Sequence, residues 1–434
     1  MTTPLHIAIV AADTDPMAAT AGISNTGREI HVAELATHLG ALGHEVTVHA
    51  RAADPNQPAS ARIAPNVDVR VVPARSHDLA SGAGAVQAAI ELGDWLRGEW
   101  SNLRPDVVHS HFWTSGIAAR AAADALQIPW CHTGHARAPT DDDEPGGTVA
   151  VRSAVETDLA RDADLVIATT FDECQQLQDR GAAVNRITRI PTGVDLAVFS
   201  PFGPSVPRTK GRRRIVMVGR LEPSKGLDDA LLALVRLPPD VELIVAGGPP
   251  IDTASGGDVV EPYEARAREL EIADRTTFVG DLARAEIAAL IRSADVVLCC
   301  PREAHAGRVA IEAMACGKPV VATRVGGLAD TVLDGLTGVF VPPRDPEAIS
   351  AAITTLMRDG EFRARLGQNA VFRARRYDWT SVAALTSAYL DRIGSSKRRR
   401  RVPNPTRTDR VREIIDLRAA DAVGARAPST RSLR

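Results

Sequence analysis

Two cations stand where a predicted strand passes through a tight turn into a helix. Ile215–Val218 is the apolar strand, and the turn after it contains Gly219, Arg220 and Lys225. Arg can bind two phosphate oxygens with its planar fork, and Lys can approach another as a point charge. The pair therefore suits the binding of a diphosphate, and the simpler interpretation as surface charge fits the spacing less well.

A second stretch places a carboxylate inside a helix. Val296–Cys300 and Val320–Thr323 are apolar runs typical of buried parallel strands, and Arg308–Cys316 between them is rich in helix formers. Such a βαβ unit presents its loops at the carboxyl ends of the strands, where ligands bind. Glu312 lies in mid-helix among small and apolar residues, so it needs a hydrogen-bonding partner if it is buried. Ribose hydroxyls would serve.

The first loop of the chain has features of a phosphate site. A strand is predicted at His6–Ala11 and a helix at Glu29–Leu42, joined by a loop rich in Gly, Asp and Asn that ends at Gly27. Free amides at a helix start bind anions, and glycine lets the backbone approach closely. Gly27 by itself also fits an ordinary turn.

Histidines follow the next two strands. His109 and His111 lie just before a predicted helix, and His135 closes the strand that begins at Cys131. The pair could bind a metal, but no third ligand follows at the spacing of zinc enzymes, so no metal site is predicted. Near neutral pH a histidine can instead donate to a hydroxyl or a developing charge. A structural role remains the alternative for all three.

The stretch Gly307–Ala322, GRVAIEAMACGKPVVA, resembles a family signature. The family is that of retaining, nucleotide-sugar-dependent glycosyltransferases, which includes sucrose-phosphate synthases and the mycothiol glycosyltransferase. Thr26–Leu35 is similar to the first loop and helix of this family. The resemblance implies an α/β fold of the GT-B type, with two Rossmann-like domains facing across a cleft. It also implies transfer of a sugar from a nucleoside diphosphate sugar to a hydroxyl acceptor.

The resemblance implies a role for each candidate residue. The catalytic set is Arg220, Lys225, His109 and His111. The two cations would stabilise charge on the departing diphosphate, so a metal-independent reaction is expected. No cofactor is expected, because the nucleotide sugar is a substrate. The donor would be held by Gly27, Gly219, Leu282, Glu303, Gly307, Arg308 and Glu312, with Glu312 on the ribose. His135 and Glu156 are assigned to the acceptor side, although Glu156 also fits a simple helix pair with Arg152.

The chain departs from the family pattern in both loops. Aligned on Gly307, Ala304 stands where the family has its first Glu, and Ala306 stands where it has an aromatic residue. Glu303 lies one residue early. In the first loop Thr26 replaces the first of two usual glycines. Either Glu303 reaches the donor sugar from its shifted position, or this chain handles the donor differently.

Segments rich in Pro, Gly and Ser divide the chain. We expect an acceptor-side Rossmann-like domain at 1–200, a linker at 201–211, a nucleotide-sugar-binding Rossmann-like domain at 212–378, a helix that crosses back to the first domain at 379–394, and a basic tail at 395–434. The tail has twelve Lys and Arg against four Asp and Glu, so it carries +8 and the remainder −11. It is expected to be disordered and solvated, with peripheral contact to acidic lipid or RNA as the alternatives.

Composition narrows the classes of function. The chain has 434 residues, of which 44% are hydrophobic and 4% aromatic, which argues against nucleic-acid binding by base stacking. The cysteines show no metal-ligand spacing, and adjacent Cys299 and Cys300 would point to opposite faces of a strand. No signal peptide or membrane span of about 18 apolar residues is evident, so a cytoplasmic protein is expected. The acidic run Asp141–Glu144 is interpreted as a solvated loop.

Two other functions remain open. A nucleotide-sugar epimerase could use the same double scaffold, and the alanines at 304 and 306 are compatible with a protein that binds a nucleotide sugar without transferring it. The sequence does not specify the sugar, the nucleotide or the acceptor.

Overall fold

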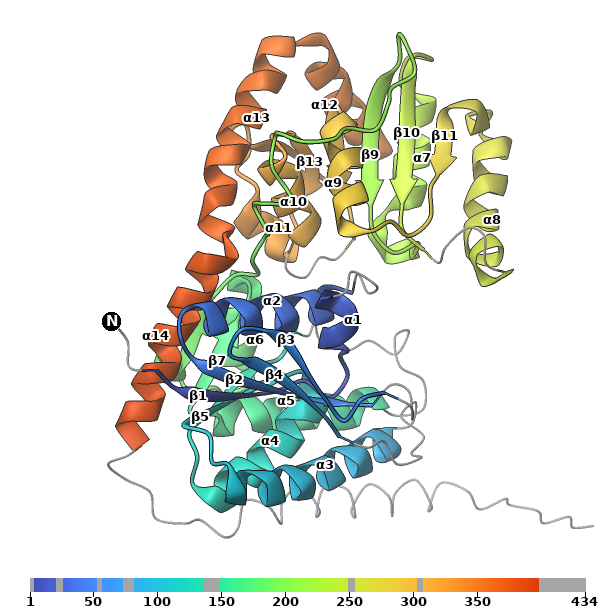
Figure 1. Ribbon diagram of the computed structural model, residues 1–434. Helices are drawn as coiled ribbons and strands as arrows, with labels where there is room; N and C mark the ends of the chain where they lie inside the picture. Colours follow the sequence, from blue (N-terminus) through green and yellow to red (C-terminus); the bar gives the residue numbers. More distant parts are fainter. Residues whose placement is uncertain are drawn as a thin grey trace, which may run out of the picture.

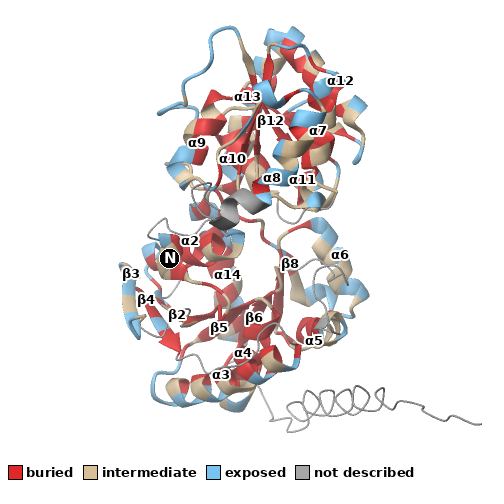
Figure 2. Cartoon of the chain, turned by 90° about the vertical axis from the view of Figure 1, so that its right-hand side faces the viewer, coloured by how far each residue is buried: buried red, intermediate tan, exposed pale blue. Residues whose placement is uncertain are grey.

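The protein consists of two α/β domains stacked one on the other, shown as the lower and upper halves of Figure 1. The computed structural model describes residues 4–20, 26–52, 57–72, 82–135, 148–248, 254–302 and 307–397. Each domain has one sheet with helices on both faces, and buried residues fill both sheets (Figure 2). The predicted fold class, two Rossmann-like domains, is confirmed.

The first sheet has the strand order β3-β4-β2-β1-β5-β6-β7-β8, and its described strands are parallel apart from the β3–β4 pair. The strands β5, β6 and β7 are buried along their whole length, because a parallel sheet is covered on both faces. Their bounds are β1 His6–Val10, β2 Glu45–Arg51, β3 Ser60–Ala64, β4 Val67–Val72, β5 Val107–His111, β6 Trp130–Thr133, β7 Leu165–Ala168 and β8 Ile187–Arg189.

Helices form two layers over this sheet. One apolar core joins the sheet to α2 and to the last described helix, and another joins it to α3, α4 and α5. The bounds are α1 Pro16–Thr20, α2 Gly27–Ala41, α3 Gly82–Asn102, α4 Trp113–Leu126, α5 Thr148–Asp162, α6 Phe171–Asp179 and the short turn η1 Val184–Arg186.

The second sheet has the order β11-β10-β9-β12-β13-β14, with every described strand pair parallel. This is the order in which Rossmann folds arrange six strands. The bounds are β9 Arg213–Val218, β10 Val241–Ala246, β11 Thr276–Phe278, β12 Val296–Cys299, β13 Val320–Thr323 and β14 Gly338–Val341.

Helices again cover both faces of the second sheet. One core includes side chains of α9 and α10, and the other includes those of α7 and α12. The bounds are η2 Pro223–Lys225, α7 Leu227–Val235, α8 Ala254–Glu269, η3 Ala273–Arg275, α9 Arg284–Ser293, α10 Arg308–Ala315, α11 Gly326–Thr331, α12 Pro346–Arg358, α13 Gly360–Ala374, η4 Arg375–Tyr377 and α14 Trp379–Lys397.

Helix α14 leaves the second domain and packs on the first (Figure 1). Val382 and Leu390 of this helix belong to the apolar core that α2 and the first sheet build. The Oγ of Ser387 lies 2.7 Å from Nε2 of His44, a buried histidine just before β2. Helix α14 therefore stabilises the first domain and joins the two domains.

The sequence also predicts a strand at Arg189–Asp195. This prediction is wrong over most of its length, since β8 ends at Arg189. Pro191 has no N–H for a sheet ladder, and the N–H of Val194 donates to the carbonyl of Tyr377 at 2.7 Å. This segment therefore contacts the returning C-terminal part of the second domain rather than extending the first sheet.

All five cysteines are free, and the four in apolar runs, Cys131, Cys299, Cys300 and Cys316, are buried as small hydrophobic residues. Within the described residues, no helix has the length and apolar character that crossing a membrane requires.

Replacing Gly193 by Ala is expected to destabilise the protein. A Cβ at this position would lie 2.3 Å from Cδ2 of Trp379, so α14 would have to move away from the first domain. We expect Gly193→Ala to lower the free energy of unfolding by about 1–3 kcal/mol, measured by urea denaturation. Gly98→Ala is the control, because nothing lies within 4 Å of that exposed helical position. Unchanged stability in Gly193→Ala would show that this contact does not hold α14.

Candidate active site

Each sheet has one point where the strand order reverses, between β1 and β5 in the first domain and between β9 and β12 in the second. Loops leave a crevice at such points, at the carboxyl ends of the strands, and α/β proteins bind ligands there. His111 ends β5, and the loop after β1 leads to Gly27 at the start of α2. Gly219 follows β9, and Gly307 stands before α10. The predicted residues therefore gather at these two edges.

The two edges face each other. A Cβ at Gly27 would lie 3.9 Å from Nη1 of Arg308, so the first turn of α2 approaches the first turn of α10. Nη1 of Arg284 lies 2.5 Å from Oε1 of Glu34, which forms an ion pair between the domains. Helices α6 and α11 also touch across the interface. Ligands bound at one edge are thus within reach of the other.

Glycine turns shape the edge of the second domain. A Cβ at Gly247, whose φ is 132°, would lie 1.9 Å from the carbonyl oxygen of Gly219. The N–H of Gly247 donates to the carbonyl of Gly280 at 2.7 Å. The turns after β9, β10 and β11 thus pack backbone against backbone, which side chains would prevent. Leu282 follows them and packs, partly buried, against the core under α9 and α10.

The two predicted phosphate-binding cations flank the short turn η2. The Arg220 side chain is 73% exposed, and its Nη1 lies 2.7 Å from Oε1 of Glu222. Lys225 ends η2 and is partly buried. Gly226 follows with a φ of 78°, and a Cβ there would lie 2.1 Å from the carbonyl oxygen of Cys300. The turn therefore packs on the end of β12, and both cations lie at the point where the strand order reverses.

Glu312 is buried in α10 beside an arginine of the same helix. It is 5% exposed, and its Oε1 lies 3.6 Å from Nε of Arg308. Burial raises the pKa of Glu312, while the charges of Arg308 and Arg284 oppose that shift. The helix starts at Gly307 with a φ of 66°, and a Cβ there would lie 3.1 Å from Oγ1 of Thr331. Glycine thus allows α10 to begin close to α11.

The three predicted histidines lie together at the edge of the first domain. Nε2 of His109 lies 2.8 Å from Oγ1 of Thr133, and Nδ1 of His111 lies 2.8 Å from Nε2 of His135. Burial lowers the pKa of His109 to about 3 and holds the pKa values of His111 and His135 well below the ordinary value. The imidazoles are neutral at pH 7, so they can hydrogen-bond to hydroxyls but supply no positive charge.

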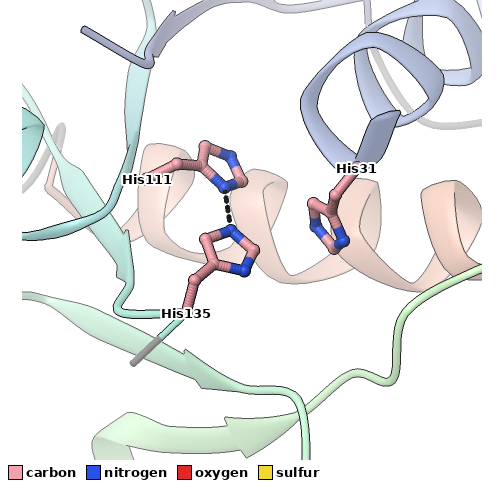
Figure 3. Close-up of side chains that lie close together, drawn as sticks. All are labelled: His31, His111 and His135. Carbon is pink, nitrogen blue, oxygen red and sulfur yellow. Dashed lines mark hydrogen bonds between the residues drawn. The ribbon is translucent and has the colours of Figure 1, made fainter. Parts of the chain in front are cut away.

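A further histidine, His31 of α2, joins this group (Figure 3). Its ring centroid lies 4.7 Å from that of His135 and 5.6 Å from that of His111. Spacing along the sequence gave no sign of this cluster, because its members come from three different elements. The sequence could have indicated His31 as a site residue, because it stands four residues after Gly27 and therefore on the same side of α2.

An aromatic ring with two arginines lies at the same edge. The guanidinium carbon of Arg28 lies 4.2 Å from the ring centroid of Phe112, and that of Arg152 lies 5.0 Å from it. Arg152 is not simply a helix pair with Glu156: Nε lies 2.9 Å from one Glu156 oxygen, and Arg180 lies 2.5 Å from the other. The predicted acceptor residue Glu156 therefore anchors two arginines and is 5% exposed.

The Arg28 guanidinium can donate a further hydrogen bond. Its Nη1 is buried and has no hydrogen-bond partner within the described residues. Burial lowers the pKa of Arg28; Asp13 counteracts this, and the charges of Arg152 and Arg220 lower the pKa further. A bound anion would satisfy the orphaned N–H and offset the repulsion between the cations. Sequence reasoning missed Arg28, although it directly follows Gly27 in the predicted phosphate loop.

Some predictions fall on residues outside the described ones: Glu303, Ala304, Ala306, the acidic run at 141–144 and the tail after residue 397. A role for Glu303 in holding the donor sugar stays a prediction.

Two Rossmann-like domains with facing ligand-binding edges make up the fold called GT-B. Residues 204–371 match the family described as Glycosyl transferases group 1, and residues 26–193 match the Glycosyl transferase 4-like domain. The chain belongs to this group 1 glycosyltransferase family, which agrees with the resemblance seen in its sequence.

Relatives match over nearly the whole chain. A D-inositol 3-phosphate glycosyltransferase of Xylanimonas cellulosilytica is 35% identical over 91% of this chain and 98% of its own length. One from Mycobacterium marinum is 34% identical, over 96% and 92% respectively. Among solved structures, sucrose-phosphate synthase of Thermosynechococcus elongatus superposes with a TM-score of 0.76 at 24% identity, covering 90% of this chain and 99% of that one, which shows the shared fold.

A small cavity lies near the histidines inside the first domain. Its volume is about 30 Å³, enough for a water molecule. Its lining residues are His132, Gly134, Glu156, Glu173, Gln176, Leu177 and Arg180. Glu173 accepts from the N–H and the hydroxyl of Thr169 at 2.6 and 2.9 Å. Burial raises the pKa of Glu173 to about 7; the Thr169 hydrogen bonds oppose this shift, and the charge of Glu156 adds to it.

Glu173 is expected to make stability depend on pH. Between pH 4.5 and about 7 the folded state keeps a proton on Glu173 that the unfolded state has lost, so this residue lowers stability as pH rises. Glu173→Gln should therefore gain stability relative to the wild type as pH rises from 5 to 7, by on the order of 1 kcal/mol per pH unit. Urea unfolding at several pH values measures this difference.

The control for that series is Asp179→Asn, because Asp179 is an exposed carboxylate at the end of the same helix. Its difference from the wild type is expected to stay constant with pH. A constant difference for Glu173→Gln as well would show that Glu173 titrates normally.

Proposed function

We propose that this glycosyltransferase moves a sugar from a nucleoside diphosphate sugar to a hydroxyl of an acceptor that carries a phosphate. We further propose retention at the anomeric carbon and no need for a divalent metal. The acceptor assignment rests on Nη1 of Arg28, which is buried without a hydrogen-bond partner among the described residues and belongs to a guanidinium near Arg152 and Arg220. The relatives that span the chain are named for a phosphate-bearing compound, D-inositol 3-phosphate, which supports the same assignment.

The donor fits the second domain. Arg220 and Lys225 would hold the diphosphate, and the first turn of α2 at Gly27 brings free helix amides toward it from the other domain. Glu312 would accept hydrogen bonds from the ribose hydroxyls, since a buried carboxylate requires such partners. The glycines in the turns after β9 and β10 carry no side chains, so the donor could approach the backbone closely at this edge.

The acceptor fits the first domain. Arg28 and Arg152 would bind its phosphate. Both arginines lie beside the ring of Phe112, and Glu156 accepts a hydrogen bond from Arg152. The neutral imidazoles of His111 and His135 would bind sugar hydroxyls without adding charge next to the reacting carbon. The two substrates then meet between the facing edges.

The cations account for the chemistry of the leaving group. Negative charge grows on the diphosphate as its bond to the sugar breaks, and Arg220 and Lys225 lie where that charge appears. They would supply the stabilisation that a divalent metal gives in other transferases. In a retaining reaction the departing phosphate and the incoming hydroxyl share one face of the sugar, so a phosphate oxygen can take the acceptor's proton. We place this reaction in the cytoplasm.

Loss of one cation should slow transfer. Lys225→Ala is expected to lower kcat by roughly a hundredfold to a thousandfold, because the transition state loses a preorganised charge. The assay follows transfer from UDP-, GDP-, ADP- and dTDP-sugars to D-inositol 3-phosphate, with and without EDTA. Lys210→Ala, an exposed lysine before β9, is the control and should retain the wild-type rate.

Two results of that assay would contradict the proposal. Activity that EDTA abolishes would mean that a metal is required, and an unchanged rate in Lys225→Ala would remove this lysine from the site. Isomerisation of the donor sugar without an acceptor would favour an epimerase, and binding of a donor without turnover would favour a non-catalytic binding protein.

Arg28 should determine the preference for a phosphorylated acceptor. Arg28→Gln is expected to raise KM for D-inositol 3-phosphate roughly tenfold to a hundredfold, the usual value of one charge-assisted hydrogen bond. The rate with unphosphorylated inositol should change little, so the ratio between the two acceptors falls. Arg97→Gln, an exposed arginine on α3, is the matched control. Equal losses with both acceptors would mean that Arg28 binds no phosphate.

A further inference from the structure

Three imidazoles from separate elements converge on one point at the edge of the first domain (Figure 3). His31 comes from α2, His111 from the end of β5, and His135 from just after β6. One ring nitrogen from each lies within 4.8 Å of those of the other two. Two of the rings are buried and the third is partly buried, so bulk water does not surround the group.

The hydrogen bonding of this cluster is incomplete. Nδ1 of His111 lies 2.8 Å from Nε2 of His135, so the two rings share a single proton between two nitrogens. Nε2 of His111 is buried without a partner within the described residues. A metal ion could take a lone pair from each ring once the proton between them moves to the other nitrogen of the ring that holds it, because neutral imidazole is a good ligand for Zn²⁺.

The spacing is close to that of a tetrahedral ion. With Zn–N bonds of about 2.0–2.1 Å, ligand nitrogens lie about 3.3 Å apart. The nitrogens in the structure are 2.8 Å apart in the closest pair and within 4.8 Å overall. Small rotations of the side chains therefore suffice to bring three ligands around one ion.

Neighbouring groups orient the rings. Nδ1 of His31 lies 3.4 Å from Oγ1 of Thr192, which leaves the other ring nitrogen for a ligand. The ring of His31 stands edge-on to Trp379 at 5.2 Å, and His111 packs on His109 at 4.1 Å. Outer partners of this kind fix the tautomer and direction of metal-binding histidines.

We propose that His31, His111 and His135 form a binding site for one divalent transition-metal ion, with Zn²⁺ as the best match, and that the bound ion inhibits sugar transfer. Three protein ligands leave a fourth position for water or an anion. The inhibitory part rests on the proposed function. An ion here would occupy the imidazoles assigned to sugar hydroxyls and would lie about one helical turn from Gly27. A transferase that needs no metal for catalysis would thus have a metal-binding site at which the bound ion inhibits sugar transfer.

Zinc binding can be measured without any substrate. Untagged, EDTA-stripped protein is titrated with ZnCl₂ by calorimetry, and with Co²⁺ by the visible absorption of the tetrahedral ion. We expect one ion per chain. His31→Gln should weaken binding at least roughly tenfold, since even outer partners of metal ligands are worth that much. His38→Gln is the matched control: His38 lies on the same helix, bonded to the carbonyl of Glu34, and is not part of the cluster.

The results of these titrations test the zinc site and the inhibition separately. Equal zinc affinity in His31→Gln and the wild type would overturn the site, as would loss of binding in His38→Gln alone. If His31→Gln does not fold, His135→Gln, in which the altered side chain is partly exposed, gives the same comparison. Zinc that binds at the site without slowing transfer would overturn the inhibition only. Because the titration uses no donor, an inactive transferase would leave the binding result intact.

Discussion

The indole of Trp379 packs against Gly193 at the joint between the two domains, and the geometry of the site depends on this contact. Trp379 is the first residue of α14, where the chain leaves the second domain, and it is 1% exposed. Its ring touches Gly193 of the first domain and stands edge-on to His31. Because α14 then continues along α2 and the first sheet, the second domain is held with its ligand-binding edge over that of the first.

Electrostatics divides the first-domain edge into two zones. Burial keeps His109, His111 and His135 neutral, so this zone can hold hydroxyls without charge. In the second zone, Arg28 and Arg152 lie beside Phe112 and their positive charges repel each other. Asp13 and Glu156 offset part of this repulsion, and a bound anion would offset more of it. This division supports the phosphorylated acceptor that we propose.

The same physical feature, imidazoles kept uncharged by burial, suits two competing ligands. Hydroxyl groups can hydrogen-bond to these nitrogens, and a transition-metal ion can take their lone pairs. In the proposed reaction, Arg220 and Lys225 on the opposite edge would stabilise the leaving diphosphate in place of a metal ion. A metal at His31, His111 and His135 and a sugar at the same place would therefore exclude each other.

Local pattern was enough to predict most of the fold and part of the site. The strands β9 and β12, the helix α10 with Glu312, and the turn with Arg220 and Lys225 follow from apolar periodicity, helix formers and glycine turns, which act over a few residues. The strand predicted at Arg189–Asp195 failed because Val194 pairs with Tyr377, far along the chain. The grouping of His31 with His111 and His135, and of Arg28 with Phe112, was decided only by the tertiary structure. Those residues belong to separate elements, and only the reversal of strand order between β1 and β5 and the packing of α2 bring them together.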